Sequence, residues 1–343
     1  MIAKFFHAWE CRLASVTKDR VVRPFEWGLD WIDANGHAPD APPETVLLDW
    51  ASHALSDSER FFDTPETANY TFTPETSGAT GTLTFPSPLQ TPHAENNTVH
   101  GRYFRSVNGA KGRRAVVVLP QWNADPNGHV GLCHLLNRFG LSALRLSLPY
   151  HDARKPPALN RADYIVSSNV ARTVQVCRQA VMDARRAVKW LHKQGYDRIG
   201  ILGTSLGSCL SLLTAAHEPL IRAQALNHIS PYFADVVWRG LSTKHVKTGL
   251  DGHIDLDTLR RMWLPISPQA YLDRVKDKKT LLVYARYDLT FPVDLSQDLV
   301  RAFQKRGIPH DVMVLPCGHY STGVAPFKYL DGFVLARFLD RNL

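Results

Sequence analysis

The chain has 343 residues, of which 44% are hydrophobic and 21% are charged. These values are typical of a globular protein with a sizeable core and argue against an intrinsically disordered chain. The formal net charge of +8 comes from lysines and arginines scattered among acidic residues, without the basic run typical of nucleic-acid-binding proteins. We therefore predict no nucleic-acid partner.

The five cysteines lie far apart and form no Cys-x-x-Cys pair, so they indicate neither a zinc site nor a disulfide framework. An odd, dispersed set is typical of a reducing compartment. Near the start, Glu10 and Arg12 interrupt what would be the apolar core of a signal peptide. No apolar run is long enough to span a bilayer, and the predicted location is the cytoplasm.

Residues 1–98 are predicted to form an arm packed on the core. A short helix rich in apolar and aromatic residues stands near its start, and proline-rich stretches follow at 39–43 and 86–92. Threonine-rich alternation between Tyr70 and Phe85 predicts one or two edge strands. If the aromatic residues of the arm were exposed, they would mark a membrane or protein contact, so a peripheral membrane contact stays open.

The core begins with a predicted strand at 99–105, followed by a turn at Asn108-Gly109. Residues 114–119 form a continuous apolar run, which is typical of a strand buried on both faces. Helical spacing at 130–139 precedes a similar strand at 141–148. A strand-helix-strand unit implies a parallel pair of strands.

A long helix is predicted between 164 and 195, with an apolar stripe that faces the sheet. The positions of the stripe recur at alternating steps of four and three: Val170, Val174, Cys177, Val181, Ala184, Val188 and Leu191. Further apolar strands are predicted at 198–202 and 221–229. Residues 231–275 break the alternation, and we interpret them as a cap inserted over the carboxyl edge of the sheet.

After the cap, strands are predicted at 280–285 and 311–315 and helices at 293–306 and 327–339. The predicted fold class is therefore α/β, with a mostly parallel central sheet flanked by helices.

Residues 203–207 read Gly-Thr-Ser-Leu-Gly between a predicted strand and a helix that starts at Leu206. In that context Gly-x-Ser-x-Gly indicates a nucleophile elbow, a strained turn that presents its central serine. Ser205 is thus the predicted nucleophile, and the alternative is an ordinary serine in a glycine-rich turn.

A serine hydroxyl is a weak nucleophile, so it needs a base and a third group that orients the base. Asp288 and His319 each follow a predicted strand, and Gly318 lets the chain turn the imidazole back toward Ser205. Asp288 as a helix-capping residue is the alternative for the acid.

Other candidates for these two roles remain. Asp235, after the preceding strand, is a second choice for the acid, and His228 or His310 for the base.

With these residues the chain from about 99 to its end resembles the α/β-hydrolase superfamily. In that superfamily the nucleophile comes first along the chain, then the acid, then the base, and Ser205, Asp288 and His319 follow the same order. The resemblance implies that Ser205 attacks an acyl carbonyl, that His319 moves its proton, and that Asp288 orients His319. The expected core comprises 99–230 and 276–343, around the cap.

An oxyanion needs two preorganised donors. We expect one to be the backbone N–H of Leu206. The other is expected from the loop after 114–119, where Pro120 has no N–H, so Trp122 is the first choice and Gln121 the second.

Residues 148–156, Gly195-Tyr196 and 265–268 resemble a poorly characterised branch of α/β-hydrolase-domain proteins, similar to dienelactone hydrolases and esterases, found in bacteria and mitochondria. Lipid deacylation has been suggested for that branch. Arg154 and Lys155 are candidates for binding a carboxylate or phosphate of the substrate, with a solvated loop as the alternative.

The aromatic and aliphatic content of the cap, including Trp238 and Trp263, suggests an apolar acyl pocket. The expected function is hydrolysis of a carboxylic ester, with a small-molecule or lipid acyl ester favoured over a peptide. An acyltransferase or peptidase with the same triad stays open, as does a non-catalytic binding module. No histidine pair has metal-binding spacing on a predicted helix, and we predict no metal or organic cofactor. The oligomeric state is not predicted.

Overall fold

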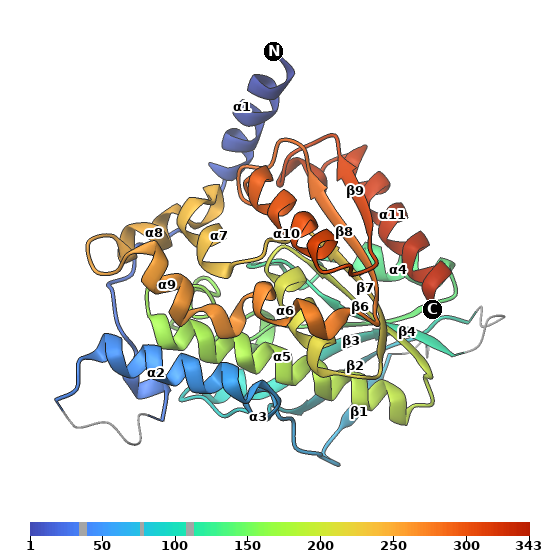
Figure 1. Ribbon diagram of the computed structural model, residues 1–343. Coiled ribbons are helices and arrows are strands. Elements are labelled where there is room, and N and C mark those ends of the chain that lie inside the picture. Colours follow the sequence, from blue (N-terminus) through green and yellow to red (C-terminus); the bar gives the residue numbers. More distant parts are fainter. Residues whose placement is uncertain (34–39, 76–78, 108–112) are drawn as a thin grey trace.

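The computed structural model describes residues 1–33, 40–75, 79–107 and 113–343. In these residues nine strands form one sheet, in the order β1-β2-β3-β5-β4-β6-β7-β8-β9 (Figure 1). The first three strands pair in antiparallel fashion, as does β3 with β5, and every pair from β5 to β9 is parallel. The predicted α/β class with a mostly parallel sheet flanked by helices is confirmed.

The strands are β1 (Thr71–Pro74), β2 (Thr80–Pro86), β3 (Thr98–Phe104), β4 (Arg114–Leu119), β5 (Ser142–Leu146), β6 (Arg198–Thr204), β7 (Ile221–Asn227), β8 (Lys279–Ala285) and β9 (Asp311–Leu315). The helices that flank the sheet are α4 (Val130–Arg138), α5 (Val170–Lys193), α6 (Leu206–His217), α10 (Val293–Lys305) and α11 (Phe327–Asn342).

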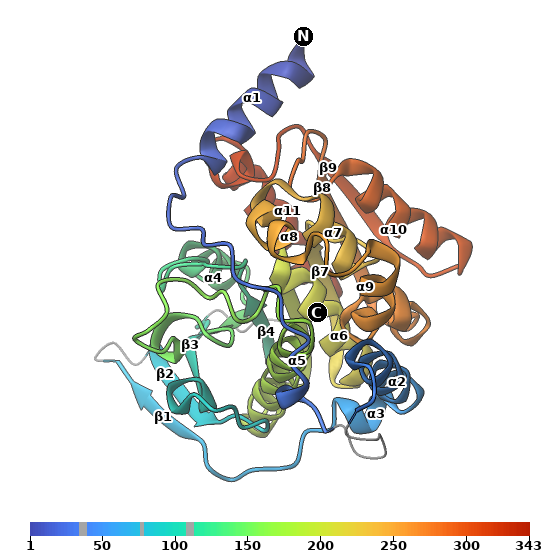
Figure 2. The ribbon, with the colours of Figure 1, turned by 90° about the vertical axis from the view of Figure 1, so that its left-hand side faces the viewer.

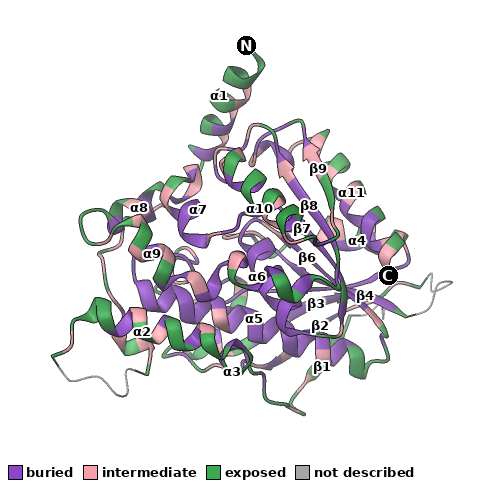
Figure 3. Cartoon of the chain, viewed as in Figure 1, coloured by how far each residue is buried: buried purple, intermediate pink, exposed green. Residues whose placement is uncertain are grey.

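Alternate residues of the buried strands point to the two faces of the sheet, as the pleat of a strand requires. In β4, Val117 packs in the core that α5 and α6 cover, and Val116 packs in the core that α4 and α11 cover. All six residues of β4 are buried. Figure 3 shows these central strands and the inner faces of α5 and α6 as buried.

The strands and helices predicted for the core are confirmed, with ends shifted by a few residues. The largest shift is in α5, which begins at Val170 rather than near 164, because the side chain of Asn169 accepts the Arg172 N–H and caps the helix there. The turn predicted at Asn108-Gly109 lies outside the described residues, as does Pro39 of the first proline-rich stretch.

The described part of the first hundred residues contains three α-helices, α1 (Ile2–Ala14), α2 (Pro43–Ser56) and α3 (Ser58–Phe61), and two short 3-10 helices, η1 (Leu29–Trp31) and η2 (Ala94–Asn97). Only α1 was expected. The proline-rich start of α2 hid that helix, although a proline at the first helical position is a common way to begin one. Residues of α2 and α3, including Leu47 and Phe61, join the larger core.

Between β7 and β8 the chain forms short helices above the carboxyl ends of the strands, where a cap was predicted (Figures 1 and 2). They are α7 (Phe233–Arg239), η4 (Leu241–Thr243), α8 (Lys244–Leu250), α9 (Leu256–Met262), η5 (Leu264–Ile266) and η6 (Pro268–Val275). Among the residues described, none of the helices is long and apolar enough to cross a membrane.

Candidate active site

Ser205 lies in a strained turn between β6 and α6. Its backbone has φ 57° and ψ −120°, a conformation that is costly for any residue with a β-carbon. A β-carbon on Gly203 would overlap the carbonyl of Gly207, and one on Gly207 would overlap the carbonyl of Leu119. The two glycines are therefore required by the close approach of three backbone segments, and the turn holds Ser205 at the carboxyl end of the sheet.

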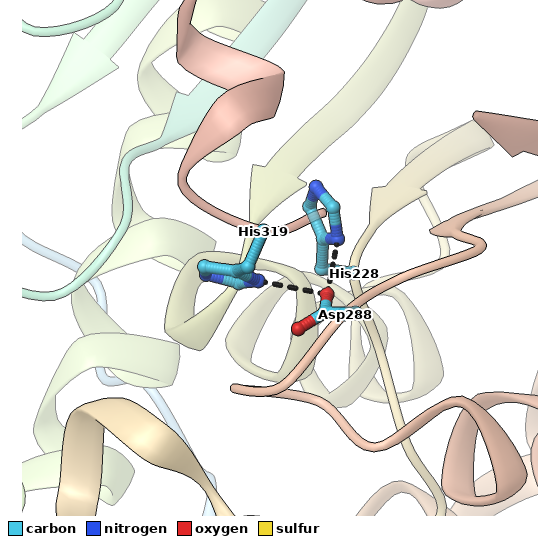
Figure 4. Close-up of side chains that lie close together, drawn as sticks. All are labelled: His228, Asp288 and His319. Atoms are coloured by element: carbon cyan, nitrogen blue, oxygen red, sulfur yellow. Dashed lines mark hydrogen bonds and ion pairs between the residues drawn. The ribbon is translucent and has the colours of Figure 1, made fainter. Parts of the chain in front are cut away.

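Asp288 lies in the turn after β8, and one of its oxygens contacts both His228 and His319 (Figure 4). Oδ1 accepts the backbone N–H groups of Thr290 and Phe291, at 2.8 and 2.7 Å. Oδ2 accepts from Nδ1 of His319 at 3.0 Å and from Nδ1 of His228 at 2.9 Å. Since a carboxylate only accepts, each of these imidazoles carries a hydrogen on Nδ1.

The charges in this group of three alter their proton affinities. Burial would raise the pKa of Asp288, but the charge of His319 and the two histidine hydrogen bonds outweigh it and hold that pKa below its usual value. Burial would lower the pKa of His319, but Asp288 and, more weakly, Glu10 raise it. Burial and the neighbouring His319 lower the pKa of His228, so His228 is the neutral member.

Ser205 and His319 both line a cavity of about 1090 Å³. His228 lines the same cavity. His319 is half-buried, whereas His228 is buried and its Nε2 has no hydrogen-bond partner among the described residues. In the described residues no hydrogen bond joins the Ser205 hydroxyl to either histidine. Geometry at apo sites is often looser than in the reacting complex, so this separation leaves both imidazoles as candidates.

The two expected oxyanion donors border the same place. Leu206 and Trp122 line a small apolar pocket of about 50 Å³ beside Ser205. Within the described residues, the backbone N–H groups of Leu206, Trp122 and Gln121 have no acceptor, whereas the next N–H, that of Asn123, donates to His151. Gln121 lines only the larger cavity.

The structure places Arg154, an expected substrate-binding residue, away from both cavities. Its side chain has no exposed surface and forms an ion pair of 2.8 Å with Asp183 in α5, because the loop after β5 folds inward beneath η2 (Ala94–Asn97). Lys155 donates to the carbonyl of Asn160 and lines neither cavity.

The two cap tryptophans also lie away from the cavities. Trp263 is buried, and its Nε1–H donates to the carbonyl of Val170. Trp238 is half-buried beneath the ammonium of Lys247, 5.2 Å from the ring. The small pocket is lined instead by Phe233, Val236 and Val237 of α7, among others.

Two alternatives from the sequence are also separated from this group. Asp235 forms an ion pair with Arg260. His310 packs on Phe303 at the amino end of β9, the opposite edge from Ser205.

Sequence reasoning missed Glu10, a fully buried acid on α1 that contacts the loop carrying His319. One signal was available: Glu10 follows Phe6 by one helical turn and so lies on the apolar stripe of α1, where an unpaired acid is unexpected.

His228, Asp288 and His319 are also the one group of histidine, cysteine and acidic side chains in the described residues that is compact enough to hold a metal ion. The distances between these side chains fit hydrogen bonds as well as they fit a metal site. The strained serine that shares their cavity favours a group that transfers protons. We therefore interpret the contacts as hydrogen bonds.

The sequence matches no protein-family model and no curated protein sequence. Solved structures match over most of the chain. The acetyl xylan esterase from Paenibacillus sp. R4 superposes with a TM-score of 0.61 at 15% identity, over 91% of this chain and 98% of the esterase. An esterase of Pyrococcus furiosus has a TM-score of 0.52 at 16% identity, over 81% and 99%.

A third match is the acylaminoacyl peptidase of Pyrococcus horikoshii, with a TM-score of 0.58 at 14% identity. It covers 80% of this chain, which spans only 42% of the peptidase. Since these identities are low, the likeness concerns the arrangement of the backbone. The sheet order, the elbow after β6 and these matches together show that the chain has the α/β-hydrolase fold.

Proposed function

We propose that the protein is a serine hydrolase that cleaves carboxylic esters. The observation that carries the proposal is the strained elbow at Ser205, which shares a cavity with a histidine hydrogen-bonded to a buried aspartate. Strain of this kind persists where the surrounding structure enforces it, and such sites are usually functional.

In the proposed mechanism the Ser205 oxygen attacks the ester carbonyl carbon while Nε2 of His319 accepts the hydroxyl proton. Asp288 holds Nδ1–H of the imidazole and stabilises the imidazolium that forms. The carbonyl oxygen becomes an oxyanion that accepts from the N–H groups of Leu206 and Trp122. His319 then protonates the alcohol oxygen as its bond to the carbonyl carbon breaks, which leaves the acyl group bound to Ser205 as an ester. A water molecule, deprotonated by His319, attacks this ester. The acid is released as His319 returns the proton to the Ser205 oxygen.

His319 is the better candidate for the base than His228. The raised pKa of His319 favours proton acceptance, whereas the lowered pKa of His228 opposes it. Nε2 of His228 is also buried, whereas the side chain of His319 keeps some exposed surface in the cavity that both histidines line.

The two cavities suggest how an ester binds. The pocket beside Ser205 and Leu206 is apolar but holds only about 50 Å³, which suits a short acyl group, and the large cavity has room for the rest of the ester. A small-molecule ester is thus favoured, and a lipid ester would have to place its acyl chain in the large cavity. A peptidase is the second candidate because solved peptidases share the fold.

Labelling with a fluorophosphonate tests the proposal. We expect the wild type to be labelled and Ser205→Ala to resist labelling. Ser211→Ala is a matched control, because this serine lies further along α6 and its buried hydroxyl has no hydrogen-bond partner in the part of the chain that the structure describes. If neither the wild type nor the control is labelled, the proposal of a serine hydrolase is contradicted and a non-catalytic binding module is supported.

A series of p-nitrophenyl esters, with an amino-acid p-nitroanilide beside them, then compares acyl chains and leaving groups. Faster cleavage of the ester series supports the esterase, and preference for the anilide supports the peptidase. Preference for acetate over octanoate would count against a lipid substrate.

A further inference from the structure

Glu10 is a buried acid that the N-terminal helix inserts beneath the loop of the candidate base. Figures 1 and 2 show α1 standing out from the body, with its last turns against the segment that follows β9. Its first turn is exposed, but Glu10 has no exposed surface. Glu10 forms no ion pair with a cationic side chain among the described residues.

The carboxylate of Glu10 is instead held by the chain just after His319. Oε2 accepts the backbone N–H of Tyr320 at 2.8 Å. Oε1 accepts the backbone N–H and the hydroxyl of Ser321, at 2.9 and 2.7 Å. Gly318, on the other side of His319, packs so closely on Glu10 that a β-carbon there would overlap the carboxyl group. The residues on both sides of His319 are therefore fixed by one side chain.

The same helix also contacts the turn of the candidate acid. The ring of Phe6 stacks on that of Tyr287, with centroids 4.6 Å apart and planes 7° apart. Tyr287 directly precedes Asp288. One helix thus touches both loops that supply the Asp288–His319 pair, although the two loops are separated along the chain.

A buried carboxylate without a cation is expensive, so its presence calls for a compensating role. Hydrogen bonds from two backbone N–H groups and a hydroxyl supply part of the compensation. Protonation of His319 supplies further compensation, because the charged groups near this imidazole are Asp288 and Glu10, and its uncharged titratable neighbours are His228 and Tyr320.

We infer that Glu10 is a positioning residue, which orients the imidazole of His319 through the 318–321 loop and supports its protonated form with a second negative charge. The inference rests on the proposed function for its catalytic consequence. A displacement of a reacting group by about 1 Å costs on the order of 10²-fold in rate, so loss of these hydrogen bonds is expected to affect turnover strongly.

The test compares Glu10→Ala, Glu10→Gln and the control Glu218→Gln. Glu218 is likewise a buried acid, but it pairs with Arg185 at the other end of the sheet. Glu10→Ala is expected to lower kcat for p-nitrophenyl butyrate by about 10²-fold with little change in KM. Glu10→Gln keeps an oxygen for Ser321 and is expected to lose less, with the acid limb of kcat/KM displaced to lower pH.

A second readout does not depend on turnover. Imidazole titration by NMR, with His319→Gln to assign the signal, is expected to show the proton leaving His319 at lower pH in Glu10→Gln than in the wild type. Glu218→Gln is expected to lower the melting temperature and leave both the titration and kcat unchanged. An inactive wild type would overturn the proposed function, while an unchanged titration and kcat in both Glu10 variants would overturn this inference.

Discussion

The imidazole rings of His228 and His319 lie with their centroids 4.5 Å apart and their planes tilted by 57°. Both donate to Oδ2 of Asp288, which has a lone pair for each. Both border the cavity that contains Ser205, but they differ in exposure: Nε2 of His228 is buried without a partner among the described residues, and the side chain of His319 is partly exposed. We therefore assign His228 as a buried residue that donates a hydrogen bond to Asp288 and His319 as the candidate base.

This division predicts unequal effects of removing the two rings. His319→Ala is expected to lower kcat/KM for an ester by about 10²–10⁴-fold, the usual contribution of a general base. His228→Asn is expected to lower it far less, because Asp288 keeps its bond to His319. Steady-state kinetics on both variants decide, and a greater loss in the His228 variant would reverse the assignment.

The raised pKa of His319 predicts the direction of the pH profile. A base acts only when deprotonated, so kcat/KM should rise with pH along a limb whose midpoint lies above the ordinary histidine value of 6.5. In Asp288→Asn the attraction is gone, so any remaining activity should have its midpoint at lower pH. A wild-type midpoint below 6.5 would contradict the electrostatic account.

The crowding around the elbow predicts that Gly207→Ala abolishes activity, because the added methyl overlaps the carbonyl of Leu119. Ester hydrolysis and circular dichroism are measured together, to separate misfolding from a local shift. Gly131→Ala is the control, since that glycine in α4 has open space around it. A fully active Gly207 variant would show that the turn is less crowded than described.

The buried pair of Arg154 and Asp183 predicts a stability defect rather than a binding defect. Arg154→Ala leaves the buried Asp183 carboxylate without its cation and with the hydrogen bond from Ser87, and breaking a buried ion pair typically costs about 3–5 kcal/mol. Lys155→Ala, at the neighbouring position, should change the free energy of unfolding little. Denaturant unfolding measures both, and a raised KM in a stable Arg154 variant would restore a role in substrate binding.

Burial raises the pKa of Asp331 to about 7, despite its hydrogen bond from Asn227. The folded state therefore keeps this proton while the unfolded state releases it, so the contribution to stability is present below the unfolded value of 3.8 and is lost as pH rises through 7. The side chain is partly accessible at the cavity, and we expect Asp331→Asn to stabilise the protein by about 1 kcal/mol at pH 8.

Thermal melts of Asp331→Asn at pH 5 and pH 8 test this. The gain should be larger at pH 8, and the exposed Asp277→Asn should show no such trend. An equal gain at both values would mean that Asp331 is ionised at neutral pH in the folded protein.

The sheet and the elbow could be predicted because their signals are local. Apolar runs mark buried strands, and the two glycines around Ser205 mark a turn that no other residue permits. Asp288 and His319 each follow a strand, so parallel topology alone brings them to one edge of the sheet.

What the sequence concealed depends on contacts between distant segments. Arg154 looked like a loop cation because its partner, Asp183, lies on the buried face of a helix nearly thirty positions away. Glu10 lies more than three hundred positions from Ser321, and no local pattern links the two. The sharing of Asp288 by two histidines joins three separate loops, and His228 lies in one of them with a φ of 58°.

The most direct test of the central claim is a crystal structure of the protein after reaction with a small fluorophosphonate. The account predicts phosphorus bonded to the Ser205 oxygen, a phosphonyl oxygen within hydrogen-bond distance of the N–H groups of Leu206 and Trp122, and Nε2 of His319 beside the adduct. An adduct on another residue, or one beside Nε2 of His228 with His319 turned away, would contradict it.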